Sequence, residues 1–119
     1  MNIIKSLCLF ITPLFLLLNS PAFAYIEKDT AIVRVMNKAA GKTQTIPIKV
    51  GQTVQHDGLV IKVQNCKQTD PFEAENFYAF LEIYTKSEVR IFSGWMNHNE
   101  PGQNPLQNET YDVWIEKCE

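Results

Sequence analysis

The sequence predicts an all-β protein, a small antiparallel β-sandwich or partly open barrel of six to seven strands with one disulfide. Three observations support this prediction: apolar residues alternate along the chain with a period of two, turn-forming residues recur at short intervals, and no segment keeps helical apolar spacing for more than two turns. Many short strands separated by frequent turns are typical of sandwiches and small barrels.

The first 24 residues have the three parts of a cleaved signal peptide. Lys5 supplies a positively charged start, residues 7–18 form an almost unbroken apolar run, and Ala22-Phe23-Ala24 matches the small-x-small pattern that signal peptidase accepts. An uncleaved anchor is the alternative, but the run has 12 residues and contains Pro13, whereas a spanning helix needs about 20. We therefore expect cleavage after Ala24 and export of the remaining chain.

Removal of residues 1–24 leaves 95 residues (119 minus 24), which suits one domain. We assign residues 25–30 to a flexible N-terminal segment and residues 31–119 to a single β domain. The net charge becomes 10 minus 13, or −3, because Lys5 leaves with the signal. This mild acidity argues against a nucleic-acid partner, because a protein that binds nucleic acid usually carries a basic stripe. We also expect no stable membrane insertion once the signal is removed.

Cys66 and Cys118 are the two cysteines that remain after cleavage. An even pair in an oxidising compartment is most simply a disulfide, which here would enclose 51 residues (118 minus 66 minus 1) and contribute about 4 kcal/mol by the loop-entropy model. A reactive thiol and an intermolecular bridge are the alternatives, but the two cysteines lack the close Cys-x-x-Cys spacing of redox enzymes.

Seven segments carry the alternation of strands, and turn residues separate them. They are residues 31–37, 43–50, 53–56, 59–66, 77–85, 88–95 and 110–117. Pro47 in the second segment cannot donate a backbone hydrogen bond, so we expect this strand at a sheet edge. Asp57-Gly58 and Lys86-Ser87 each predict a tight hairpin between neighbouring segments.

The fourth and fifth segments are expected to supply much of the core. In the fourth, Leu59, Ile61 and Val63 share one side, which places Cys66 on the other, less apolar side. The fifth segment is apolar on both sides, which suits a central strand. One side carries Phe77, Ala79, Leu81 and Ile83, and the other carries Tyr78, Phe80, Glu82 and Tyr84. The polar residues 67–76 between these segments predict a surface loop.

Residues with catalytic or metal-binding chemistry are few. His56 and His98 are accompanied by no His-x-His, Cys-x-x-Cys or Glu-x-x-His spacing, and Ser93-Gly94 lacks the flanking glycine of a nucleophile elbow. We therefore predict no catalytic residues, no metal and no cofactor, and we expect that the protein is not an enzyme. A small hydrolase or metal-dependent enzyme that uses His98 is the weakest of the alternatives.

A candidate binding surface borders residues 97–108, a long turn-rich connection of the kind that often carries function. Tryptophan rings suit stacking on sugars or anchoring a protein interface, although such a ring more often simply fills a small core. Arg90 and Asp112 are candidates for an ion pair across the bordering strands. The candidate residues of this surface are Trp95, Asn97, His98, Trp114, Arg90 and Asp112.

Two strings carry a resemblance to a known family: Phe92-Ser93-Gly94-Trp95-Met96 and the later Tyr111-Asp112-Val113-Trp114. With Cys66, Cys118 and the Ala79-Phe80-Leu81-Glu82-Ile83 strand, they resemble the small exported bacterial family called domain of unknown function 2155, over about residues 31–118. The resemblance implies an alphaproteobacterial periplasmic protein with paired Cys66 and Cys118. It implies no function, because the family has none assigned.

The function that we expect is that of a non-enzymatic interaction module in the periplasm, which contacts an envelope protein through residues 97–108 and the bordering aromatic side chains. The alternative is a module that binds peptidoglycan or another envelope polysaccharide, since tryptophan rings also stack on sugars.

Overall fold

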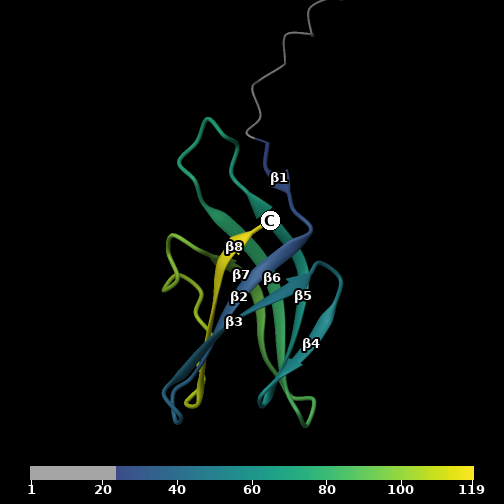
Figure 1. Cartoon of the computed structure of the whole chain (residues 1–119), viewed down its shortest axis with the longest axis vertical. Coiled ribbons are helices and arrows are strands. Elements are labelled where there is room, and N and C mark those ends of the chain that lie inside the picture. The colour runs from purple at the N-terminus through teal and green to yellow at the C-terminus, as the bar shows by residue number, and fades with distance from the viewer. Residues whose placement is uncertain (1–23) are drawn as a thin grey trace, which may run out of the picture.

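Eight strands form two antiparallel sheets in residues 24–119, the part of the chain that the computed structural model describes (Figure 1). The strands are β1 (Ile26–Glu27), β2 (Thr30–Asn37), β3 (Lys42–Lys49), β4 (Thr53–His56), β5 (Leu59–Gln68), β6 (Phe77–Thr85), β7 (Arg90–Asn97) and β8 (Tyr111–Cys118). The predicted all-β antiparallel fold is confirmed, since these strands lie in two separate sheets that do not close into a barrel. The predicted signal peptide lies outside the described residues, except for Ala24.

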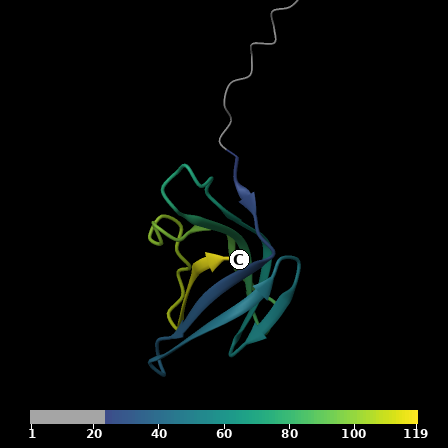
Figure 2. The ribbon, with the colours of Figure 1, turned by 45° about the horizontal axis from the view of Figure 1, so that its top comes forward.

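The two sheets differ in size. The five-stranded sheet has the order β1-β5-β6-β7, with β4 also paired to β5, and the three-stranded sheet has the order β3-β2-β8. Figures 1 and 2 show the three-stranded sheet lying across the five-stranded one. Within residues 24–119, the strand with Pro47, β3, pairs with β2 alone, so its predicted place at a sheet edge is confirmed.

The core lies between the sheets and follows from the alternation in the sequence. Inward-facing side chains such as Val33 on β2, Leu81 on β6 and Ile115 on β8 are at most 1% exposed. Burial of an aliphatic side chain of this size contributes about 1.5–3 kcal/mol. Because β6 pairs with both β5 and β7, the strand predicted to be central is confirmed as an interior strand.

The prediction that Cys66 lies on the less apolar side of its strand is wrong, because its side chain is fully buried. The register of β5 against β6 shifts between Val63 and Asn65, so that Gln64 is an extra residue opposite no partner. Such a bulge reverses the alternation beyond it. The odd-numbered residues of β5 therefore face the core up to Val63, and Cys66 faces it afterwards.

A second bulge turns Cys118 toward the core in the same way. Along β2, Ile32 pairs with Lys117 and the next residue, Val33, pairs with Ile115, which leaves Glu116 as the extra residue of β8. The predicted disulfide is present, with a Cα–Cα distance of 5.6 Å between Cys66 and Cys118. It joins β5 of one sheet to β8 of the other.

The segment predicted to be a flexible start, residues 25–30, contains a strand. Ile26 pairs with Gln68 and Glu27 with Lys67, and the backbone N–H of Lys28 donates to the carbonyl of Cys66 at 2.8 Å. Two residues are too few to show a period, so this strand exists only through its pairing with β5.

Of the two predicted hairpin turns, Asp57-Gly58 is confirmed and Lys86-Ser87 is too short. Asp57 adopts a φ of 56°, as the Asp57-Gly58 turn requires, and β4 pairs with β5 directly across it. The second turn is longer than Lys86-Ser87, because Glu88 adopts a φ of 67° and β7 begins only at Arg90. A non-glycine residue in this left-handed region marks a turn that a dipeptide pattern does not reveal.

Candidate functional site

The β7–β8 loop, residues 98–110, begins in a cluster of asparagine side chains. The Asn97 carboxamide oxygen accepts hydrogen bonds from Asn76 Nδ2 at 2.7 Å and from the backbone N–H of Asn99 at 3.0 Å. The Asn76 oxygen in turn accepts from the backbone N–H groups of Phe77 and Asn99. Asn76 is 8% exposed, so these bonds satisfy a buried polar group. Asn97 thus fastens the loop to β6.

His98 is also engaged with the body of the sandwich. Its Nδ1 lies 3.0 Å from the backbone carbonyl of Ile115, and its ring packs edge-on against Phe77 with the centroids 5.9 Å apart. A carbonyl oxygen only accepts hydrogen bonds, so Nδ1 carries the proton and donates it. His98 is half-buried and links the start of the loop to β8.

The middle of the loop closes one side of the sandwich. Leu106 is 5% exposed and belongs to the core cluster, and Asn104 Nδ2 donates to the backbone carbonyl of Trp95 at 3.1 Å. The latter bond covers part of the free edge of β7. Residues 97–108, which the sequence predicts as the contact loop, are therefore fastened to the protein at Asn97, His98, Asn104 and Leu106.

The two tryptophans lie on opposite outer faces, so the prediction that they share one surface is wrong. Trp95 is on the outer face of the five-stranded sheet and is 40% exposed. Trp114 is on the outer face of the three-stranded sheet, where the Arg34 guanidinium lies 5.6 Å from its ring centroid. Arg34 also pairs with Glu116 at 2.7 Å. The alternation in the sequence predicts that β7 and β8 each have an inner and an outer face, but it does not show which sheet each strand joins.

The expected ion pair between Arg90 and Asp112 does not form. Asp112 lies on β8 and is 3.6 Å from Lys38 Nζ, whereas Arg90 lies in the other sheet, opposite Tyr84. The reason is the same as for the tryptophans, because β7 and β8 belong to different sheets. Both members of the Lys38–Asp112 pair are about 40% exposed, so the pair contributes at most about 1 kcal/mol.

Five side chains form a continuous surface on the outer face of the five-stranded sheet, which we call the aromatic face. They are Tyr25, Lys67, Tyr78, Phe80 and Trp95. The ammonium of Lys67 lies 4.1 Å from the ring centroid of Tyr25 and 4.6 Å from that of Trp95. Tyr25 packs edge-on against Tyr78, and Trp95 packs edge-on against Phe80, at centroid distances of 5.6 and 5.4 Å. Cation–π and edge-to-face contacts thereby hold the five side chains together.

Part of this surface was predicted from the sequence: Trp95 was a candidate binding residue, and Tyr78 and Phe80 were placed together on one side of the central strand. Tyr25 and Lys67 were not predicted, because Tyr25 precedes a two-residue strand and Lys67 follows the bulge of β5. The apolar second side of the central strand was the signal that pointed to the aromatic face.

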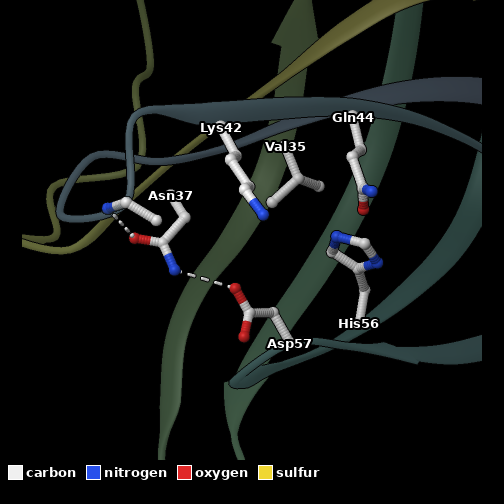
Figure 3. Close-up of a pocket in the computed structure, with 7 residues that line it drawn as sticks. Val35, Asn37, Lys42, Gln44, His56 and Asp57 are labelled. Atoms are coloured by element: carbon white, nitrogen blue, oxygen red, sulfur yellow. Dashed lines mark hydrogen bonds between the residues drawn. The ribbon is translucent and has the colours of Figure 1, made fainter.

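A cleft of about 420 Å³ opens between the β2–β3 hairpin and the β4–β5 turn (Figure 3). Its lining residues are Val35, Asn37, Ala40, Lys42, Gln44, His56 and Asp57. Asn37 Nδ2 donates to Asp57 Oδ2 at 2.9 Å, and this bond joins the two walls. His56, which lacks any metal-ligand spacing in the sequence, is half-buried here.

Two further observations concern residues 24–119. In this part of the chain, no group of three or more His, Cys, Asp or Glu side chains is placed to hold a metal ion. It also contains no helix that is long and apolar enough to cross a membrane.

Comparison with known proteins adds one finding. No curated protein and no solved structure matches the chain significantly. The model of a family described as an uncharacterized protein conserved in bacteria (DUF2155) matches residues 31–118, which are 88 residues (118 minus 31 plus 1) and thus most of the chain. The match spans seven of the eight strands and both cysteines. The chain therefore belongs to this uncharacterized bacterial family, DUF2155.

Proposed function

We propose that the protein is a non-enzymatic binding module of the bacterial cell envelope, exported to the periplasm, and that the aromatic face is its binding surface. One observation carries this proposal. Tyr25 and Trp95 are 46% and 40% exposed, and they lie beside the partly exposed Tyr78 and Phe80 on a sheet face where polar residues are usual. The signal pattern and the disulfide support export, because disulfides persist in oxidising compartments.

The partner that we propose is an envelope protein. Tyrosine and tryptophan are enriched among the side chains that dominate binding energy at protein interfaces. In the aromatic face each ring already packs edge-on against a neighbour, so little side-chain freedom remains to be lost on binding. The β7–β8 loop has a supporting role in this proposal, since Asn104 holds the backbone of Trp95.

Photocrosslinking in cells tests this proposal. A photoreactive amino acid at Ser93, exposed on the outer face of β7 next to the aromatic face, is compared with one at Thr45, exposed on the outer face of β3. We expect a discrete protein adduct from Ser93 alone, lost in Trp95→Ala and retained in Trp114→Ala, with folding of both variants checked by circular dichroism. An adduct that forms equally from both positions, or that persists in Trp95→Ala, would contradict the proposal.

A glycan is the second candidate partner, and Lys67 is the observation that favours it. Its ammonium lies between two exposed rings and has no carboxylate within 4 Å among the described residues. The rings suit stacking on a sugar, and the ammonium suits a nearby carboxylate such as those of the peptides attached to the peptidoglycan sugars. Retention by purified sacculi that is lost in both Trp95→Ala and Lys67→Gln would favour the glycan. Absence of retention would favour the protein partner.

A further inference from the structure

The cleft between the β2–β3 hairpin and the β4–β5 turn is unusual for its polar lining. On β2, the inward-facing positions run from Val33 and Val35 to Asn37. On β3 the positions paired with inward-facing residues of β2 run back from Ile48 and Ile46 to Gln44 and Lys42. Inward-facing positions of a sandwich are normally apolar, because they meet the opposite sheet.

Three strands change from apolar to polar at the same level of the sandwich. Val35 pairs with Gln44 and Asn37 pairs with Lys42 in the three-stranded sheet, and β4 of the other sheet changes from the packed Val54 to His56. The polar side chains therefore meet in one place instead of being scattered over the surface. Figure 3 shows Lys42 and Gln44 reaching from one wall toward His56 and Asp57 on the other. Val35, which is 2% exposed, lies at the bottom of the cleft.

The cleft has one cationic and one anionic group, on opposite walls. Among the described residues, Lys42 Nζ makes no hydrogen bond and no ion pair within 4 Å. Asp57 Oδ2 accepts from Asn37, and Asp57 Oδ1 accepts from no side chain of the same part of the protein. The Asn37 bond also fixes the direction of the Asp57 carboxylate. A free ammonium thus faces a carboxylate that has one free oxygen, across a cleft of about 420 Å³.

We propose that this cleft binds a small zwitterion, a molecule that carries a carboxylate and an ammonium group such as an amino acid or a short peptide. The ligand carboxylate accepts from Lys42 Nζ, and the ligand ammonium donates to Asp57 Oδ1. Gln44 and His56 lie beside the two charges in the same cleft (Figure 3) and supply further donors and acceptors. The volume of about 420 Å³ lies within the range of small-molecule sites, which is roughly 300–1,000 Å³. This site is separate from the aromatic face and does not depend on the proposed function.

Three small probes distinguish a zwitterion site from a general polar surface. Glycylglycine carries both charges, N-acetylglycine lacks the ammonium, and glycylglycinamide lacks the carboxylate. Each probe is titrated at constant ionic strength into the purified protein, and backbone amide shifts are followed by NMR. We expect saturable shifts in residues 40–44 and 56–58 with glycylglycine, and binding at least tenfold weaker with either of the other probes.

Two variants each remove one charge of the site. Lys42→Gln and Asp57→Asn are expected to weaken glycylglycine binding at least tenfold. The matched control is Lys49→Gln, which removes an exposed lysine of the same strand that does not line the cleft and is expected to leave binding unchanged. Asparagine tolerates the positive φ of Asp57, so Asp57→Asn keeps the turn.

Three results would each overturn the proposal. The first is the absence of saturable shifts around the cleft with glycylglycine. The second is equal binding of the three probes, and the third is equal binding by wild type, Lys42→Gln and Asp57→Asn, because neither charge then contributes to recognition.

Discussion

Loss of the disulfide is expected to lower the free energy of unfolding by about 4 kcal/mol. The perturbation is Cys66→Ala combined with Cys118→Ala, which removes the covalent link between β5 and β8. Both side chains are buried between the sheets, so the bond constrains how the two sheets are placed relative to each other. No other covalent side-chain link joins the sheets within residues 24–119.

The magnitude follows from the length of chain that the bond closes. The two cysteines are 52 positions apart, and the loop-entropy model gives about 14 cal/mol/K for a loop of that size, or about 4 kcal/mol at 25 °C. Typical small proteins have a total stability of about 5–15 kcal/mol, so this loss is a large part of the whole. Replacement by alanine also removes two buried sulfur atoms, which adds a smaller packing loss.

Urea unfolding of three forms measures the effect. The forms are the oxidised protein, the same protein reduced under denaturing conditions and refolded with reductant, and the double alanine variant, each followed by circular dichroism and tryptophan fluorescence. The reduced form keeps both sulfur atoms and so isolates the covalent bond. With slopes of about 1–3 kcal/mol/M, the midpoint is expected to fall by at least about 1 M. A loss below about 1 kcal/mol in both forms would refute the loop-entropy argument for this protein.

Two further predictions concern packing around the β7–β8 loop and the β4–β5 turn. Leu106→Ala is expected to lower the free energy of unfolding by about 2–4 kcal/mol, because this buried side chain closes the core beneath the loop. Urea unfolding measures it, and a loss under about 0.5 kcal/mol would mean that the loop does not seal the sandwich. Gly58→Ala is expected to cost about 1–3 kcal/mol, because a Cβ at this position lies 2.6 Å from the hydroxyl oxygen of Tyr111, which also accepts from the Gly58 N–H. Combining Tyr111→Phe with Gly58→Ala is expected to restore part of the lost stability, because it removes the hydroxyl that the new Cβ meets. If stability is not restored, the clash with this hydroxyl is not the cause of the loss.

The strands were predictable because their signals are local. Alternation along β2, β5 and β6 reflects one buried and one outer face, and such a pattern is visible in the sequence whatever the strand order is. The Asp57-Gly58 turn was predictable for the same reason, since positive φ is a property of one residue and its neighbours. The disulfide was predictable from the count of cysteines and the signal pattern, without any knowledge of geometry.

The candidate site was predictable only in part. Trp95 was predicted as a candidate binding residue, with a core position left open, but it was grouped with Trp114, Asn97 and His98, which the fold separates from it or uses to fasten the β7–β8 loop. The residue type alone does not show whether an aromatic or polar side chain is free to contact a ligand or is already used in packing and hydrogen bonds within the protein. Which of the two applies depends on what the opposite sheet and the loop place beside it.

The amino-acid sequence alone indicated seven of the eight described strands, the Asp57-Gly58 turn, the cysteine pair and the family to which the chain belongs. Three features follow only from the three-dimensional fold: the inward orientation of Cys66, the separation of the two tryptophans, and the meeting of Lys42 and Asp57 in one cleft. They do so because a single-residue bulge reverses the alternation of a strand, and because strand pairing joins segments that are far apart in the sequence. Neither one leaves a periodic signal along the chain.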